Sequence, residues 1–351
     1  MFFASDNAGP AHPSIMDALT TANQGYAMGY GADPLMDEVR TQIRDLFAAP
    51  EAAVYLIING TAANSVLLGT MSQPWQTIFC SDVAHIHEDE CNAPEFYTGA
   101  KLTLVPSADG KMDPADLRTK ILAEENRGVH GPQRGPLSLT QVTEKGTLYT
   151  LDEMKALTDV AQAFGMQTHL DGARFANALV ALDCSPAELT WKAGIDAVSF
   201  GGTKNGALGV EACVIFDPAL AWEFELRRKR GGHLLSKHRY LSAQMQAYLA
   251  DGLWLTLARS ANDRCAQLAR GLRGHNAVEI LFPPQANIIF FQMARREHKR
   301  MLDGGAVYYV MNGDPATGDP DAPLIGRLVT DWSMTAEGVS QFLDLLHGSP
   351  G

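Results

Sequence analysis

The sequence has little of what membrane-bound, disulfide-bonded or nucleic-acid-binding proteins require. No apolar run approaches the roughly 20 residues that span a bilayer, and the chain starts with neither a basic segment nor a long apolar one. The five cysteines are scattered without a Cys-x-x-Cys pair, which is typical of buried thiols in a reducing compartment. A formal net charge of −12 argues against nucleic acid or an anionic membrane as a partner. We therefore expect a cytoplasmic protein with no nucleic-acid and no membrane partner.

Two common phosphate-binding fingerprints are also absent, since the chain has neither a Walker loop nor a G-x-G-x-x-G segment. A different turn of small residues is present at Asn59-Gly60-Thr61-Ala62-Ala63-Asn64, between an apolar strand and a helix. The backbone N–H groups and the dipole of such a helix start can bind phosphate, and the Thr61 hydroxyl adds a donor. The same turn is equally typical of a plain strand-to-helix connection. Both interpretations stay open at this point.

Segments with strand character alternate with helical patterns through residues 35–215. We expect strands at 54–58, 77–80, 102–105, 137–140 and 210–216, and helices at 34–48, 61–71 and 113–124. Thr150-x-x-Glu153 is a capping box that starts a further helix. This alternation predicts an α/β fold with a mostly parallel sheet of about seven strands, covered by helices on both faces. The strand at 210–216 is expected to lie antiparallel.

The pattern changes after Asp217. A helical stretch over about 219–270 is broken at Gly231-Gly232 and at Gly252, and residues 278–346 read as strand, strand, helix, strand, loop, strand and helix. A chain of 351 residues that is 46% apolar is long enough for two domains. We expect a large domain with an N-terminal arm over 1–240, a helical connection over about 219–270, and a smaller C-terminal α+β domain over 250–351.

Two charged residues follow neighbouring strands in the first part of the chain. Lys204 stands in the run Phe200-Gly201-Gly202-Thr203-Lys204-Asn205-Gly206, and Asp171 stands in His169-Leu170-Asp171-Gly172-Ala173-Arg174. Ligands of open α/β sheets bind where strands end. A lysine and an aspartate at such ends suit pyridoxal phosphate: the amine forms a Schiff base with its aldehyde, and the carboxylate pairs with its pyridine nitrogen. Each residue alone is more typical of a turn, so the prediction depends on the pair.

The run His85-Ile86-His87-Glu88-Asp89-Glu90-Cys91 suggests a metal site, because His-x-His-x-Asp occurs in two-metal hydrolases. No other histidine cluster supplies the remaining ligands, so we predict that no metal binds. His85 alone is a candidate base, or a flat ring beside a cofactor. The alternative is a histidine at a helix cap, with His87–Glu90 forming a solvated acidic turn.

The remaining cationic residues of interest also have alternative explanations. Arg227–Arg230, with Lys237 and Arg239, form the one dense basic cluster, and a solvated helix face explains most of it. Lys237, after the Gly231-Gly232 break, is the candidate for binding an anion such as a cofactor phosphate. Arg327 lies inside an apolar strand, where it requires either a bidentate carboxylate ligand or an internal salt bridge.

These motifs together resemble the low-specificity L-threonine aldolases, pyridoxal phosphate enzymes of the aspartate-aminotransferase-like fold type I. The resemblance covers nearly the whole chain. Its specific motifs are Asp171-Gly172-Ala173-Arg174 and Gly201-Gly202-Thr203-Lys204-Asn205-Gly206. The supporting stretches are Phe3–Asn7, Tyr30–Asp33, Asn59–Asn64, Ala84-His85 and Arg327–Thr330.

The resemblance implies a role for each candidate residue. Lys204 would carry pyridoxal 5'-phosphate, Asp171 would bind its pyridine nitrogen, and His85 would stack on its ring and act as a base. Gly60 and Thr61 would hold its phosphate, with Lys237 reaching in from a neighbouring subunit. Ser5, Arg174 and Arg327 would hold the substrate carboxylate, with Arg174 also beside the cofactor, and Tyr30 would line a partner subunit's site. The large domain would thus be the cofactor-binding one, in a homodimer or homotetramer.

The implied activity is retro-aldol cleavage of L-threonine, L-allo-threonine and related β-hydroxy-α-amino acids to glycine and an aldehyde, a carbon–carbon lyase reaction. The alternative is other chemistry on the same cofactor, such as β-elimination or transamination. One stretch departs from the family. Many members carry a histidine that contacts the substrate hydroxyl soon after the strand matching 137–140, where this chain has Gln141-Val142-Thr143-Glu144-Lys145-Gly146. The group that binds the hydroxyl, and with it the threo or allo preference, is therefore open.

Overall fold

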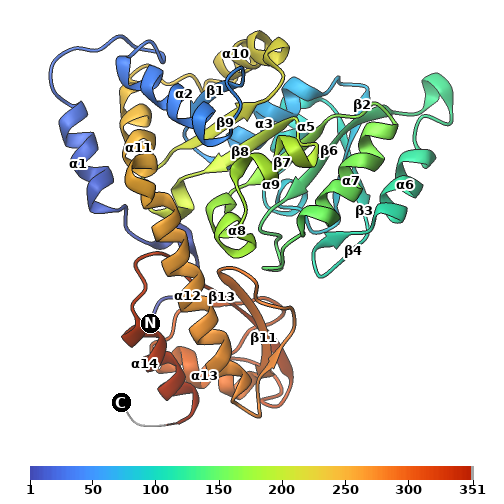
Figure 1. The fold of residues 1–351 in the computed structure, drawn as a ribbon. Coiled ribbons are helices and arrows are strands. Elements are labelled where there is room, and N and C mark those ends of the chain that lie inside the picture. Colours follow the sequence, from blue (N-terminus) through green and yellow to red (C-terminus); the bar gives the residue numbers. More distant parts are fainter. Residues whose placement is uncertain (349–351) are drawn as a thin grey trace.

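The computed structural model describes residues 1–348 and contains a larger and a smaller β-sheet, connected by a long helix (Figure 1). The larger sheet has the strand order β1-β9-β8-β7-β6-β2-β3. Its strands are β1 Ala53–Ile57, β2 Gln76–Ser81, β3 Lys101–Val105, β6 Gln133–Thr140, β7 Thr168–Gly172, β8 Ala197–Gly201 and β9 Glu211–Ile215. The pairs β8–β7, β7–β6, β6–β2 and β2–β3 are parallel. β9 is antiparallel to both of its neighbours, which confirms the predicted mostly parallel sheet and the antiparallel strand near 210–216.

Helices cover both faces of this sheet, and β1 shows why. Its alternate residues Ala53, Tyr55 and Ile57 pack with α3 and α10, whereas Val54 and Leu56 pack into the core on the other face. A strand buried on both sides reads as a continuous apolar run. One face carries α3 Gly60–Met71, α5 Ala93–Thr98 and α10 Ala221–Arg230; the other carries α2 Pro34–Leu46, α6 Pro114–Ala123, α7 Leu151–Ala163, α8 Phe175–Leu182 and α11 Arg239–Leu249.

The smaller sheet has the order β10-β11-β13-β12. Its elements are β10 Glu279–Ile280, β11 Ile288–Ala294, α13 Arg295–Asp303, β12 Tyr309–Val310, β13 Pro323–Val329 and α14 Ala336–Leu346. This is the order expected for 278–346. Phe3 is buried in this second core, where its ring meets that of Phe342 at 4.9 Å, so the first residues pack with the last ones. The division at 1–240 and 250–351 stays a prediction.

The long helix α12, Leu253–Arg273, packs against α8 beside the larger sheet and against α14 beside the smaller one (Figure 1). The expected helical stretch over 219–270 is thus three helices, α10, α11 and α12, which are separated at the predicted glycine breaks. No helix within residues 1–348 has the length and apolar character needed to cross a membrane.

Several helices were not expected, among them α1, Pro13–Ala22, and α8. α1 begins at His12, whose Nδ1 accepts a hydrogen bond from the Ser14 N–H at 3.2 Å. α8 is apolar at nearly every position, and Phe175–Leu179 are all buried. A helix that is apolar all round shows no polar face and therefore no helical period, which is why the sequence pattern did not reveal α8.

Candidate active site

The predicted cofactor residues converge at one edge of the larger sheet. The strands β1, β2, β6, β7 and β8 run in the same direction (Figure 1). At or just beyond their carboxyl ends lie Gly60, His85, Glu144, Asp171 and Lys204. The carboxyl edge of such a sheet is where ligands bind. Residues separated by up to about 145 positions are therefore brought together.

Asp171 is buried and held by two kinds of donor. Its Oδ1 accepts from the Ala173 N–H at 3.0 Å, and its Oδ2 accepts from Asn64 Nδ2 at 2.9 Å. The amide oxygen of Asn64 in turn accepts from Ser199 Oγ at 2.8 Å. The carboxylate thus has a fixed orientation, as a partner of a protonated ring nitrogen requires.

Lys204 lies in the turn η4, Thr203–Asn205, directly after β8. A Cβ atom at Gly201 would lie 2.5 Å from the Ala173 carbonyl oxygen, so only glycine allows this close approach. The Gly202 N–H donates to Glu211 Oε2 at 2.9 Å, which ties the turn to the start of β9. The backbone that carries the lysine is therefore fixed on two sides.

Several charges act on the Lys204 amine. Burial and then the positive charge of Arg174 lower the pKa of Lys204, while the carboxylates of Asp6, Asp171 and Glu211 oppose this. A lowered pKa raises the share of neutral amine, the nucleophilic form of lysine. The site therefore favours attack of this amine on a carbonyl group.

The turn after β1 forms the start of α3. Asn59 caps the helix, and its side chain accepts from the Ala62 N–H at 2.9 Å. A Cβ atom at Gly60 would meet nothing within 4 Å, so the space above the first helical N–H groups is open. A helix start of this kind binds phosphate through its N–H groups and dipole. The donors present here fit the phosphate of pyridoxal phosphate.

His85 is the first residue of α4, His85–Glu88, and two carboxyl groups hold it. Its backbone N–H donates to Glu144 Oε1 at 2.9 Å, and its Nδ1 lies 2.9 Å from Glu90 Oε1. The hydrogen bond to Glu90 raises the pKa of His85; burial and Lys204 oppose this, and Asp171 supports it. The side chain of Glu90 is buried, so the interpretation of His87–Glu90 as a solvated turn is wrong for Glu90.

Asp6 occupies the guanidinium edge of Arg174. Arg174 Nε donates to Asp6 Oδ2 at 2.7 Å and Nη2 donates to Oδ1 at 2.9 Å. Asn287 Nδ2 also donates to Asp6 Oδ2 at 3.1 Å. Ser5 next to it caps the turn η1, Asp6–Ala8, by accepting from the Asn7 N–H. The arm therefore reaches the site, although Arg174 is already paired along one edge.

Arg327 on β13 has a different environment. Its Nη2 donates to the Ala4 carbonyl oxygen at 3.2 Å, and its guanidinium lies 5.1 Å from the centre of the Tyr309 ring. Its buried Nε has no partner among residues 1–348, and no carboxylate of these residues lies within 4 Å of it. Burial and the charge of Arg174 lower the pKa of Arg327. The described residues thus supply no internal salt bridge, the alternative considered for this arginine.

Tyr30 and Lys237 lie together, at the surface. The Tyr30 N–H donates to the Ser236 carbonyl oxygen at 3.1 Å, next to Lys237, and both side chains are exposed. In the basic cluster, Arg228 is the exception to the predicted solvated face. It is buried, lies over the Tyr55 ring at 4.9 Å and donates to the Leu56 carbonyl oxygen.

One group of possible metal ligands overlaps this site. One ligand atom each of His85, Glu90 and Asp171 lies within 4.8 Å of the others. Asn64 Nδ2 donates to both carboxylates, so part of their capacity to bind a cation is already used. His87 contacts Glu88 instead, at 3.3 Å. The absence of a metal stays a prediction.

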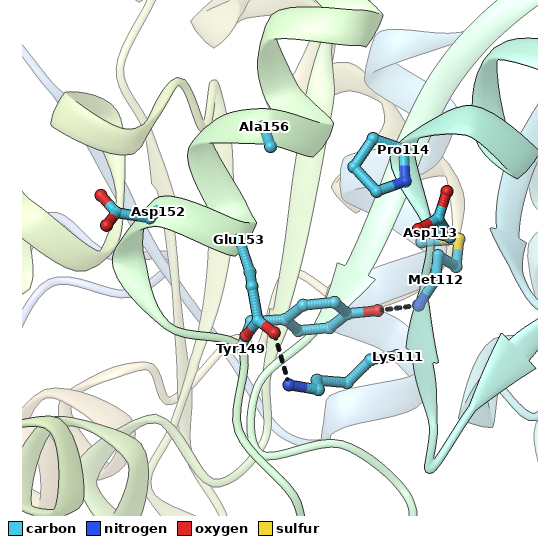
Figure 2. Close-up of a pocket in the computed structure, with 8 residues that line it drawn as sticks. All are labelled: Lys111, Met112, Asp113, Pro114, Tyr149, Asp152, Glu153 and Ala156. Carbon is cyan, nitrogen blue, oxygen red and sulfur yellow. Dashed lines mark hydrogen bonds and ion pairs between the residues drawn. The ribbon is translucent and has the colours of Figure 1, made fainter.

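A second hollow lies away from these strand ends, between β5, Lys111–Met112, and α7 (Figure 2). Lys111 Nζ pairs with Glu153 Oε1 at 2.7 Å, and the Met112 N–H donates to the Tyr149 hydroxyl at 2.8 Å. Figure 2 shows these two pairs as dashed lines, whereas no dashed line reaches the carboxylates of Asp113 and Asp152. The hollow contains none of the predicted site residues.

Asp6, Asn64, Glu90 and Asn287 are among the residues of this site that were missing from the sequence interpretation. Three of them lie within runs that were singled out, namely Phe3–Asn7, Asn59–Asn64 and His85–Cys91. Their positions within these runs could have drawn attention to them. Their hydrogen-bond partners could not be found from the sequence, because the pairs Asp6–Arg174 and Asp6–Asn287 span 168 and 281 positions.

The sheet order and the lysine and aspartate at its carboxyl edge define an α/β enzyme of pyridoxal phosphate fold type I. A threonine aldolase of Leishmania major shares this structure with a TM-score of 0.92 and 26% identity, over 99% of this chain and 98% of that one. The predicted aspartate-aminotransferase-like fold is therefore confirmed.

The comparisons by sequence agree with this class. The model of the beta-eliminating lyase family matches residues 3–296, and the chain belongs to this family. Low specificity L-threonine aldolases of Pseudomonas sp. strain NCIMB 10558 and Pseudomonas aeruginosa are 41% and 40% identical to it over 313 and 314 residues. These matches cover 89% of this chain and 89% or 90% of the two relatives.

The Asp6–Arg174 pair yields a prediction about stability. Burial raises the pKa of Asp6, but Arg174, Lys204 and the hydrogen bonds outweigh burial, so the net pKa is lowered. Asp6→Asn leaves the buried guanidinium without its counter-charge, and we expect a loss of about 3–5 kcal/mol in the free energy of unfolding at pH 7.

The pKa of Asp6 is lower in the folded state than in the unfolded state. Its contribution to the free energy of unfolding is therefore present above about pH 4 and is lost as the pH falls through the pKa of the folded state. Urea unfolding of wild type and variant at several pH values measures this difference. Asp17→Asn, at an exposed position of α1, is the matched control. An Asp6→Asn variant as stable as the control at pH 7 would contradict the prediction.

Proposed function

We propose that this protein is a pyridoxal-phosphate-dependent aldolase that cleaves L-threonine, L-allo-threonine and related β-hydroxy-α-amino acids to glycine and an aldehyde. The observation that carries the proposal is the juxtaposition of Lys204, Asp171 and the open start of α3 at one sheet edge, in a chain 40–41% identical to low specificity L-threonine aldolases. When bound, the cofactor supplies an electron sink for the bond that breaks.

Residues of this chain bind the cofactor and the substrate. Lys204 binds the cofactor through its amine, Asp171 keeps the ring nitrogen protonated, and the N–H groups at Gly60 and Thr61 take the phosphate. Arg327 presents its Nε–H, which is unpaired within residues 1–348, to the substrate carboxylate. Arg174 is less available for this role, because Asp6 already occupies its Nε and Nη2 edge.

His85 exchanges the proton of the substrate hydroxyl through its ring. The hydrogen bond to Glu90 raises the pKa of His85, and histidine is the side chain best suited to proton transfer near neutral pH. Ser5 borders the carboxylate site from the arm, and Arg174 borders it from the turn between β7 and α8. All five cysteines are free thiols, which supports a reducing compartment such as the cytoplasm.

The family description favours one second candidate, β-elimination, because the matching model is that of beta-eliminating lyases. Product analysis separates the two reactions. Aldol cleavage gives glycine and acetaldehyde from L-threonine, whereas β-elimination gives ammonia and a 2-oxo acid.

We also propose a homo-oligomer, a dimer or a tetramer, with active sites shared between subunits. Tyr30, Trp222 and Leu226 line one surface hollow and are exposed. Tyr26 and Met28 on the adjoining loop are exposed as well, and a patch of this kind is typical of a protein interface. Tyr30 and Lys237 lie at this surface and serve the partner's site.

Lys204→Ala tests the cofactor link. We expect purified wild-type protein to be yellow and to release glycine and acetaldehyde from L-threonine. The variant should lose the visible absorption band and nearly all turnover, because no other amine replaces Lys204. Lys192→Ala, an exposed lysine, should retain both. Full activity of Lys204→Ala would rule the assignment out.

Arg327→Lys tests the carboxylate anchor. A lysine cannot reproduce the two parallel donors of a guanidinium, so we expect kcat/KM for L-threonine to fall by the equivalent of about 2–4 kcal/mol. Looser binding of the carboxylate should also raise the share of racemisation or transamination. Steady-state kinetics and solvent deuterium exchange at the Cα of alanine measure the two effects. Arg296→Lys, on the exposed part of α13, is the control, and an unchanged kcat/KM for Arg327→Lys would remove this residue from the site.

Shared sites predict complementation. Lys204→Ala and Lys237→Ala subunits are each expected to be inactive alone, and in a mixed dimer one of the two sites would have both lysines intact. Random pairing of equal amounts should restore about one quarter of wild-type activity. Co-expression with two different tags isolates the mixed species. Inactive mixed dimers, or an active monomer in sedimentation at assay concentration, would argue against shared sites.

A further inference from the structure

A buried carboxylate outside the predicted set, Glu90, lies between the histidine and the aspartate of the site. Its Oε1 accepts from Asn64 Nδ2 at 2.9 Å and lies 2.9 Å from His85 Nδ1. The second oxygen, Oε2, is buried and has no partner among residues 1–348. A carboxylate withdrawn from water in this way is costly unless its charge is used. The cation that it can pair with is the protonated ring of His85.

Asn64 fixes the position of Glu90 relative to Asp171. Its Nδ2 donates to both Glu90 and Asp171, and its Oδ1 accepts from Ser199 Oγ. If the amide were flipped, its oxygen would face two carboxylates, so one orientation is strongly favoured. The four side chains His85, Glu90, Asn64 and Asp171 thus form one continuous chain of hydrogen bonds.

We propose that Glu90 is a positioning residue, which holds the Nδ1 hydrogen of His85 on its carboxylate so that Nε2 is the nitrogen that exchanges the substrate proton. Asn64 holds Glu90, and with it His85, at a fixed position relative to Asp171. The proposal rests on the proposed function, in which His85 handles the proton of the substrate hydroxyl. His85 Nε2 has no hydrogen-bond partner within residues 1–348, so it is available for that exchange.

The charges around His85 show why a carboxylate is needed at position 90. Lys204 on η4 disfavours a protonated ring, as does burial, while Asp171 on β7 and Glu90 favour it. Glu144, from the loop after β6, bonds the backbone N–H rather than the ring. Asp171 is already engaged by Asn64 and Ala173. Glu90 is therefore the carboxylate that contacts the ring directly.

The test is Glu90→Gln in the complete holoenzyme. Glutamine is close in shape, and its amide oxygen can still accept from Asn64 and His85, but the negative charge is gone. We expect normal cofactor absorption, a kcat for L-threonine cleavage lower by roughly 10-fold, and a KM within about 2-fold. The acid limb of the kcat profile should move to lower pH, because the imidazole loses the partner that raises its pKa.

Glu88→Gln is the matched control. It lies two residues from Glu90 and on the helix of His85, α4, but its exposed carboxylate pairs with His87, so kcat and the pH profile should stay at wild-type values. Glu90→Gln with wild-type kcat and an unchanged acid limb would overturn the proposal. A variant that loses only cofactor or thermal stability, with kcat per bound cofactor unchanged, would also overturn it and leave Glu90 a structural role.

A second measurement does not depend on turnover. In the substrate-free holoenzyme labelled with ¹³C-histidine, the His85 resonance is assigned with His85→Asn, and its titration is followed by NMR. Glu90→Gln should lower the midpoint, and Glu90→Asp, which keeps the charge on a shorter stem, should lower it less. An unshifted midpoint in both variants overturns the proposal. If wild type fails to cleave L-threonine, the proposed function fails, while the titration still decides the role of Glu90.

Discussion

The site depends on the hydrogen bonds of one buried amide, that of Asn64. This side chain joins α3 to the ends of β7 and β8 through Asp171 and Ser199, and to the segment after α4 through Glu90. Residues Ala62–Met71 of α3 are all buried, so core packing sets the direction of this helix. The same helix therefore carries both the open N–H groups of its first turn and the Asn64 amide that holds Asp171. In the proposed site, one rigid element would thus position the groups for both ends of the cofactor.

The electrostatics of the site differ from those of the whole chain. The protein carries a net charge of −12, yet Lys204, Arg174 and Arg327 gather where the arm meets the sheets. Burial and then the charge of Arg174 lower the pKa of Lys204 and that of Arg327. Asp6 neutralises part of this charge, and burial raises the pKa of Glu211 beneath the lysine turn to about 7. These three cations suit a ligand that carries a phosphate and a carboxylate.

The parts of the fold that could be predicted are those with a local signal. The motifs at the strand ends could be recognised because each lies within a few residues; they contain Gly60, His85, Asp171 and Lys204. The order of elements after residue 278 followed from the periodicity of apolar residues. The all-apolar α8 has no period to read. Asp6 and Glu90 have the types of ordinary turn residues, and only folding shows that Asp6 meets Arg174 across 168 positions and that Glu90 is buried against Asn64. The proposed arrangement of subunits has no signature in one sequence, because the exposure of Tyr30 is seen only in the folded chain.

The antiparallel insertion of β9 has a consequence for motion. Because β9 begins where β8 ends, the connection between them is short and is closed by bonds from Gly202 to Val210 and Glu211. Gln244 of α11 further accepts from the N–H groups of Leu208 and Gly209 at 3.0 and 2.9 Å. A segment tied at so many points cannot open like a lid. Any exchange of partners by the Lys204 amine must therefore be a change of its own side-chain rotamer rather than a loop rearrangement.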